Sequence, residues 1–348
     1  MTYRVIQWET GVLGRCGLRT LIARPDFELV GIYTTDPAEA GRDAGEIVGV
    51  APTGVIATSD VEQVMTLKAD CVAYLAAPAV LRGRDPGFDV STITRFLASG
   101  KNVVTTAGFI NPKARDPGLA ATLEDACQAG SSSLHGTWIN PGFMTAALPL
   151  TLSGLSAQID HIYVRECADL STHPSRWIVV DLVGFTREPA DHARTVRPYR
   201  GYLHGLFTEC MHLVADGIGV KLEGIEESYE HEVAAQAYEI AAGTMPAGGV
   251  SGARWLFAGV AGGRPFITFE FIKLADPSLV SSWPSPGVTL RITGQPSLSV
   301  IVDEVTSDLT AATAHAVNSI PGVCAAPPGI RTILDLPNVI GRGAAQIA

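Results

Sequence analysis

The sequence predicts an α/β protein whose first part is a Rossmann-type parallel sheet and whose second part is an α+β domain on an open, mostly antiparallel sheet. Up to about residue 140, short apolar runs alternate with runs of helical spacing, whereas long extended runs dominate afterwards. Strand–helix alternation with short loops is typical of parallel strands joined by right-handed crossovers. A chain of 348 residues is also long enough for about two domains.

The first part is expected to alternate strands and helices from its first residues. A strand over residues 5–8 leads into a helix over residues 12–24, which ends at Pro25. A second strand covers residues 27–33. The later expected elements are strands over residues 55–58, 71–75, 103–105 and 133–138, helices over 91–99 and 119–129, and a helix start at the capping box Ser59-Asp60-Val61-Glu62.

The second part is expected to contain two β-hairpins. Ala261-Gly262-Gly263-Arg264 separates extended runs over residues 254–260 and 266–274, and such a glycine pair is typical of a tight hairpin turn. The second expected hairpin joins strands over residues 288–292 and 298–302, which Thr293-Gly294-Gln295-Pro296 separates. The other expected elements are strands over residues 159–168 and 228–238, and helices over 143–152, 177–182, 203–217 and 308–318.

Composition and charge exclude several classes of protein. Apolar residues make up 47% of the chain, which argues against intrinsic disorder, and the net charge of −10 without a basic run argues against a nucleic-acid or anionic-membrane partner. The longest apolar stretch, residues 71–81, is too short to span a bilayer. The six scattered cysteines predict a reduced, cytoplasmic protein without a metal site.

A glycine loop after the first strand predicts a dinucleotide site. The loop reads Glu9-Thr10-Gly11-Val12-Leu13-Gly14, so that the second and third glycines of G-x-G-x-x-G are Gly11 and Gly14. Glycines at these positions let the backbone approach a pyrophosphate at a helix N-terminus. The cofactor-binding residues expected here are Thr10, Gly11, Val12, Leu13 and Gly14.

Glu9 occupies the first glycine position of this motif. Its carboxylate is expected to lie near the phosphates and to weaken binding by like-charge repulsion. The alternative is that Glu9 accepts a hydrogen bond from a loop N–H and stabilises the turn.

The end of the second strand bears on the choice between NAD and NADP. Thr34 and Thr35 follow the strand, and Arg42 lies nearby in sequence; hydroxyl groups and arginine suit a 2′-phosphate and favour NADP. Asp36 leaves NAD open, because an acid near this point binds ribose hydroxyls. A turn without any ligand is a further alternative.

Two later strand ends carry small residues that suit a nicotinamide ring. These are Ala76-Ala77-Pro78 and Thr106-Ala107-Gly108, and ligands of parallel sheets bind at such carboxyl ends. Asn140, in Asn140-Pro141-Gly142-Phe143, is expected to bind the carboxamide or a substrate oxygen. The alternative is that this segment only caps the following helix.

Hydride transfer also needs a proton partner. The first candidate is His173 in the turn Ser171-Thr172-His173-Pro174-Ser175, and the second is Tyr202, together with Tyr199 and His204. Arg165-Glu166-x-x-Asp169 is interpreted as a solvated strand edge.

Four motifs in order resemble a known family. Tyr3-Arg4-Val5-Ile6-Gln7-Trp8, Asp43-Ala44-Gly45-Glu46, Gly100-Lys101-Asn102-Val103-Val104-Thr105-Thr106 and Asn140-Pro141-Gly142-Phe143 resemble the dihydrodipicolinate-reductase-like NAD(P)-dependent oxidoreductases. Within that group, the chain resembles the characterised 2,4-diaminopentanoate dehydrogenase and the native amine dehydrogenases. The resemblance covers nearly the whole chain.

The resemblance implies a Rossmann domain over residues 1–140 that residues 306–348 complete, and a substrate-binding and dimerisation domain over residues 141–305. It implies NADH or NADPH as cofactor and an active site between the domains. The glutamate that handles the proton in amine dehydrogenases falls on Gly108 here, so that it is missing.

The sequence therefore predicts an NAD(P)H-dependent oxidoreductase that reduces a small ketone or imine, or oxidises the corresponding amine. The alternative is a nucleotide-binding sensor or scaffold without turnover, which the departures at Glu9 and Gly108 suggest. A homodimer is expected, because residues 266–272 place apolar side chains on both faces of their strand and the second face needs a cover.

Overall fold

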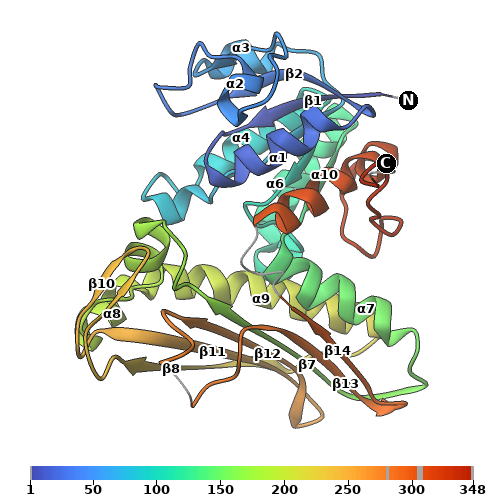
Figure 1. The fold of residues 1–348 in the computed structure, drawn as a ribbon. Coiled ribbons are helices and arrows are strands. Elements are labelled where there is room, and N and C mark those ends of the chain that lie inside the picture. Colours follow the sequence, from blue (N-terminus) through green and yellow to red (C-terminus); the bar gives the residue numbers. More distant parts are fainter. Residues whose placement is uncertain (1, 280–281, 304–308, 346–348) are drawn as a thin grey trace. The chain divides into compact units, whose positions relative to one another are not determined.

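The computed structural model describes residues 2–279, 282–303 and 309–345. The chain divides into two compact units, Met1–Ile139 with Leu309–Ala348 and Asn140–Asp308 (Figure 1). No helix within the described residues is long and apolar enough to cross a membrane.

The first unit contains a seven-stranded sheet in the order β15-β6-β5-β4-β1-β2-β3, and its neighbouring strands are all parallel. This arrangement confirms the predicted Rossmann-type sheet. The strands are β1 (Tyr3–Trp8), β2 (Phe27–Tyr33), β3 (Ala57–Thr58), β4 (Cys71–Tyr74), β5 (Asn102–Thr105), β6 (Ser133–Gly136) and β15 (Gly329–Ile330).

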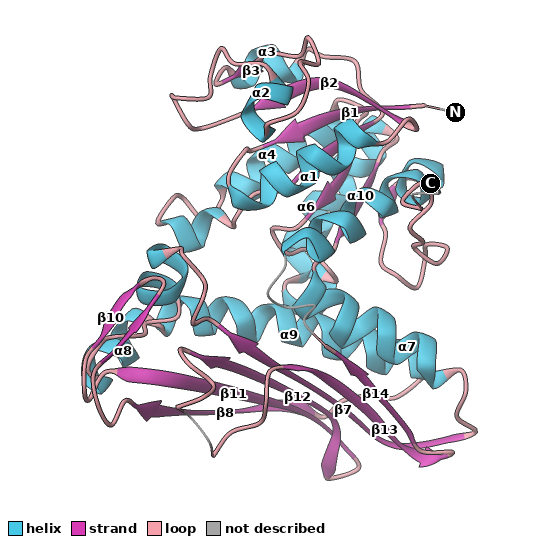
Figure 2. Cartoon of the chain, in the orientation of Figure 1, coloured by secondary structure: helices cyan, strands magenta, loops and turns pink. Residues whose placement is uncertain are grey.

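Helices cover both faces of this sheet, as Figure 2 shows. The helices are α1 (Val12–Ala23), α2 (Ala44–Val48), α3 (Val61–Met65), α4 (Phe88–Ala98), α5 (Pro112–Arg115), α6 (Pro117–Gly130) and α10 (Leu309–Ala325), with a 3₁₀ turn at Ala79–Arg82. Leu21 of α1 and Ile320 of α10 pack on one face, while Phe96 of α4 and Leu123 of α6 pack on the other. Helix α3 begins one residue later than the capping box predicts, because Asp60 and not Ser59 caps it.

The second unit is built on a six-stranded sheet in the order β14-β13-β7-β12-β11-β8. Every neighbouring pair is antiparallel except β7 with β12, which confirms the mostly antiparallel sheet. Gly262 and Gly263 form the predicted hairpin turn, with φ values of 61° and 70°. The strands are β7 (Gln158–Asp169), β8 (Gly224–Val233), β11 (Val250–Ala261), β12 (Arg264–Leu274), β13 (Gly287–Gln295) and β14 (Leu298–Val302).

Two expected elements of this unit are interrupted. The strand expected over residues 228–238 ends at Val233, and β9 (Tyr238–Ile240) pairs instead with β10 (Gly243–Met245). The helix expected over 143–152 consists of a π-helical segment, Ile139–Ala147, followed by α7 (Leu148–Ser153). Its first residues are not helical, because Asn140 and Pro141 are extended and Gly142 has a φ of 139°.

Helices α7 and α9 (Arg197–Ile218) lie along one face of this sheet (Figure 1). The remaining helical elements are α8 (Pro189–Thr195) and a π-helical segment at Trp177–Leu182. The ring of Phe207 in α9 lies 4.7 Å from that of Phe257 and 5.8 Å from that of Phe269. The covered face therefore holds the aromatic core of this unit.

The opposite face is more polar than the sequence suggests. Tyr163 and Arg254 both contact the carboxylate of Glu270, which is 4% exposed. Trp283 packs over Cys167 and Ile272. The expectation of an uncovered apolar face is therefore wrong for most of this surface, although Ile301 on β14 is 67% exposed.

We predict a homodimer through this face, because the family resemblance implies a dimerisation role for this domain, and we expect the exposed side chain of Ile301 at the contact. Light scattering at micromolar concentration should give twice the chain mass of 36.6 kDa. Ile301→Asp should shift the population toward monomer, because it places a charge in the apolar part of the contact. Leu155→Asp, which changes another exposed apolar side chain, is the control. A wild-type mass of one chain would contradict the prediction.

Candidate active site

The loop between β1 and α1 leaves a helix N-terminus free for an anion. Gly11 is the N-cap of α1, no side chain caps this helix, and its first turn holds no acidic residue. A β-carbon at Gly11 would meet nothing within 4 Å. The free N–H groups and the open approach fit a pyrophosphate.

Gly14 has a different role in the same turn. A β-carbon on Gly14 would lie 2.1 Å from the carbonyl oxygen of Glu9, so the helix packs directly on the loop. Glu9 itself has a φ of 72°, in the left-handed region that favours glycine. The loop therefore has the backbone conformation of a glycine at the first motif position while it carries a carboxylate.

Thr34 and Thr35 at the end of β2 have different surroundings. The Thr34 hydroxyl is buried and lies 2.5 Å from the Thr10 hydroxyl. Thr35 is exposed, and its hydroxyl donates to the Glu9 carboxylate at 3.0 Å. Thr35 is therefore the better placed of the two hydroxyls to meet a ligand.

The ends of β4 and β5 provide small residues and one unpartnered polar atom. Ala76 and Ala107 are buried, and Ala77 and Pro78 are half-buried. The Thr106 hydroxyl is buried without a hydrogen-bond partner. A buried polar atom of this kind calls for a ligand or an ordered water.

These four loops follow parallel neighbouring strands, and so they lie at one edge of the sheet. The first unit thus places together nearly all residues that the sequence predicts for the cofactor, and their chemistry fits a dinucleotide. They are Thr10, Gly11, Val12, Leu13, Gly14, Thr34, Thr35, Ala76, Ala77, Pro78, Thr106, Ala107 and Gly108.

The second unit holds a buried carboxylate at the end of β7. Glu166 is 3% exposed, so its interpretation as part of a solvated strand edge is wrong. Its Oε1 atom forms an ion pair with Nζ of Lys273, and Nδ2 of Asn140 donates to its Oε2 atom at 2.7 Å. We call Asn140, Glu166 and Lys273 the carboxylate cluster.

The parallel pairing of β7 with β12 brings two of these residues together. Glu166 pairs with Phe271, and Lys273 lies two residues further along β12, so its side chain is on the same face. This is the face that α9 covers, because Phe271 also contacts Phe207. The ammonium group of Lys273 lies 4.0 Å from the centre of the Phe271 ring.

Asn140 joins the cluster through the extended backbone at the start of its segment. The side chain bonds Glu166 and does not cap the following helix, where Thr145 accepts the N–H of Gly142 at 2.9 Å. The Oδ1 atom of Asn140 is buried and has no hydrogen-bond partner among the described residues. The cluster therefore offers a vacant hydrogen-bond acceptor.

The other proton-donor candidates differ in their relation to this cluster. Burial and the charge of Lys273 lower the pKa of His173, so its imidazole is neutral at pH 7 and a poor acid there. Its Nδ1 atom accepts the Ser175 N–H at 3.2 Å.

The aromatic and histidine candidates of α9 lie in other surroundings. Burial and the charge of Glu166 raise the pKa of Tyr199, which keeps its proton. His204 lies 3.0 Å from the Glu227 carboxylate, in a partly exposed pair, and Tyr202 is half-buried on α9.

The sequence analysis missed Glu166 and Lys273, although the strands contain a signal for both. One face of the sheet carries residues 162, 164, 166 and 168 of β7. The same face carries residues 267, 269, 271 and 273 of β12. Each row is apolar or aromatic except for one charged residue, and the two charges are opposite. Such a pair at the matching ends of two core strands indicates a buried ion pair.

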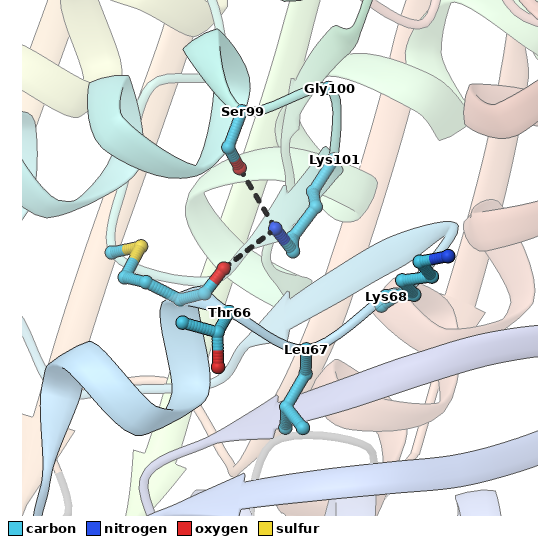
Figure 3. A pocket seen from close by; sticks show the side chains of 8 residues that line it. Thr66, Leu67, Lys68, Ser99, Gly100 and Lys101 are labelled. Carbon is cyan, nitrogen blue, oxygen red and sulfur yellow. Dashed lines mark hydrogen bonds between the residues drawn. The ribbon is translucent and has the colours of Figure 1, made fainter.

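A pocket at the amino ends of the strands is unrelated to these residues. It is lined by Met65, Thr66, Leu67, Lys68, Ala69, Ser99, Gly100 and Lys101 (Figure 3). The ammonium group of Lys101 donates to the Met65 carbonyl and the Ser99 hydroxyl, both at 3.0 Å. These two hydrogen bonds stabilise the loops that line the pocket.

Comparisons with known proteins agree with this architecture. The sequence profile of the 2,4-diaminopentanoate dehydrogenase C-terminal domain matches residues 143–344. An amine dehydrogenase of Streptomyces virginiae is 30% identical, with 97% of each chain covered. The chain belongs to this dehydrogenase family. The 2,4-diaminopentanoate dehydrogenase of Acetoanaerobium sticklandii is 26% identical over 96% of this chain and 93% of its own.

The fold has a full-length counterpart among solved structures. The amine dehydrogenase of Mycobacterium smegmatis superposes with a TM-score of 0.77 at 21% identity, covering 98% of this chain and 97% of its own. The present chain, as a member of the dehydrogenase family, is an NAD(P)-dependent oxidoreductase that uses a nicotinamide cofactor.

We predict that alanine substitutions at the two motif glycines of the loop have different effects, one on stability and the other on cofactor binding. Gly14→Ala should lower the free energy of unfolding by about 1–3 kcal/mol, because its β-carbon overlaps the Glu9 carbonyl. Gly11→Ala should change that free energy by less than about 1 kcal/mol and weaken NAD(P)H binding. Chemical denaturation and nicotinamide fluorescence measure the two effects, and a Gly14→Ala protein as stable as the wild type would contradict the prediction.

Proposed function

We propose that this oxidoreductase is an amine dehydrogenase that interconverts a small amine and the corresponding ketone plus ammonia through an imine. The relatives named for amine and diaminopentanoate oxidation support the substrate class. The observation that carries the proposal is the vacant acceptor Oδ1 of Asn140 beside the Glu166 carboxylate.

The chemistry of the cluster favours a nitrogen substrate. Lys273 and the Asn140 amide nitrogen already donate to Glu166, which leaves an acceptor oxygen as the unsatisfied group. An amine or iminium N–H can donate to this oxygen, whereas a ketone oxygen can only accept. A substrate with an N–H group therefore satisfies Asn140, and a ketone does not.

The reaction can be written on these residues. A substrate ammonium first loses a proton, and Glu166 is the carboxylate nearest to Asn140 that can receive it. The neutral amine then donates its N–H to Oδ1 of Asn140, which orients its carbon. Bound nicotinamide supplies the hydride acceptor in this direction and the hydride donor in reverse. The resulting iminium takes up water and releases ketone and ammonium.

In this proposal, Glu166 takes over the role of the glutamate that is missing at position 108. The resemblance to amine dehydrogenases implies a proton-handling glutamate at that position, which glycine cannot replace. Glu166 brings a carboxylate from β7 instead.

Ketone reduction without ammonia is the second candidate. The glycine at position 108 favours it, and the Lys273 ammonium group can donate to a carbonyl oxygen. In this case the product is an alcohol.

The proposal is tested by NADH and NADPH titration followed by steady-state assays on a panel of small ketones, with and without ammonia. We expect binding below about millimolar and nicotinamide oxidation that requires ammonia. Oxidation that is independent of ammonia would indicate ketone reduction. Binding without turnover on the whole panel would indicate the sensor or scaffold alternative, and both results contradict the proposal.

We predict that Glu166→Gln lowers kcat by about 10²–10⁴-fold without changing the NAD(P)H dissociation constant, because it removes the proton acceptor. Glu270→Gln is a matched control. Glu270 is also a buried, ion-paired glutamate of the same sheet, and it lies on the opposite face. Equal losses of kcat in the two variants would contradict the assignment, and thermal denaturation of both checks their folding.

A further inference from the structure

We infer that Glu9 binds the adenosine ribose hydroxyls and so makes the enzyme select NAD(H) over NADP(H). This inference rests on the dinucleotide site of the proposed function. It assigns a specificity role to the residue that replaces the first glycine of the motif, and it reverses the preference for NADP that the hydroxyls after β2 suggest.

The carboxylate of Glu9 occupies the position where an acid meets the ribose. In dinucleotide-binding folds an acid near the end of the second strand binds the ribose hydroxyls. The Oε2 atom of Glu9 accepts from the Thr35 hydroxyl at 3.0 Å and lies 3.4 Å from the Thr35 nitrogen. The carboxylate of Glu9 thus lies at the end of β2, although its backbone belongs to the loop after β1.

The backbone of Glu9 fixes this position. The Glu9 N–H donates to the carbonyl of Tyr33, the last residue of β2, at 2.9 Å. The left-handed φ of 72° is unfavourable for a residue with a side chain and is the kind of strain that structures retain at ligand sites. The side chain is only 15% exposed.

The residues that follow β2 do not provide this acid themselves. The Thr34 hydroxyl is buried against Thr10. The carboxylate of Asp36 accepts the Ala38 N–H at 2.9 Å and so stabilises its own turn. Glu39, which also follows β2, is 2% exposed, forms an ion pair with Arg15 and accepts from the Thr34 hydroxyl at 3.5 Å. The Oε1 atom of Glu9 lies 3.8 Å from Arg84, beyond hydrogen-bond distance, so this oxygen can still accept from a ribose hydroxyl.

The consequence differs for the two cofactors. The ribose hydroxyls of NAD can donate to Oε1, which is a charge-assisted hydrogen bond. A 2′-phosphate has no proton to donate at neutral pH and carries nearly two negative charges, so it is repelled at this distance. Arg84 offsets only part of this repulsion, because a single positive charge cannot balance both the carboxylate and the phosphate, and its side chain is 43% exposed.

The test is the ratio of the dissociation constants for NADPH and NADH, measured by nicotinamide fluorescence at two salt concentrations. We expect the wild type to bind NADH about ten-fold more tightly or better. Glu9→Gln should bring the ratio close to one, mainly through tighter NADPH binding. The wild-type preference should also shrink at high salt.

Two further variants keep the test decisive. Glu9→Gly suits the positive φ, so it removes the carboxylate without threatening the loop and should lose selectivity in the same way. Asp36→Asn changes the alternative acid and should leave the ratio unchanged. A wild type that prefers NADPH, or a ratio that is unchanged in both Glu9 variants, would overturn the inference. Failure to bind either cofactor would instead overturn the proposed function.

Discussion

The carboxylate cluster of the second unit depends on one buried charge, the carboxylate of Glu166. A carboxylate removed from water is costly unless it is paired and hydrogen-bonded. Here Lys273 provides the opposite charge and Asn140 the hydrogen bond. The parallel register of β7 and β12 and the extended start of the 139–147 segment are the conditions under which these three groups meet.

The same sheet holds a second buried carboxylate under different constraints. Glu270 faces away from α9, where its Oε1 atom forms an ion pair with Arg254 and its Oε2 atom accepts from the Tyr163 hydroxyl. Glu166 instead shares its carboxylate with Asn140, whose own oxygen stays vacant. The two carboxylates therefore differ in their partners: those of Glu270 carry no free acceptor toward a ligand, whereas Asn140 carries an amide oxygen with neither a hydrogen bond nor an ion pair among the described residues.

Periodicity and glycine placement predicted much of the first unit. The strand over residues 27–33 and the loop from Glu9 to Gly14 follow local rules, since strand alternation and a glycine-rich turn need no distant partner. The direction of the Glu9 side chain did not follow, because it depends on a left-handed φ and on Thr35 of another strand.

The second unit was harder to predict for a related reason. Glu166 and Lys273 are 107 residues apart in sequence, and only the pairing of β7 with β12 makes them partners. Read alone, a glutamate beside Arg165 is typical of an exposed strand. The break after Val233 was also missed, because β9 pairs locally with β10 and not with the sheet.

Asn140 and Glu166 are proposed to form a site for a nitrogen substrate. The most direct measurement compares the affinities of an amine and the ketone of the same carbon skeleton by calorimetry, with the enzyme saturated by a tetrahydronicotinamide analogue that transfers no hydride. The account predicts that the amine binds at least about ten-fold more tightly, because only its N–H satisfies the vacant oxygen of Asn140. Equal affinities, or tighter binding of the ketone, would contradict it.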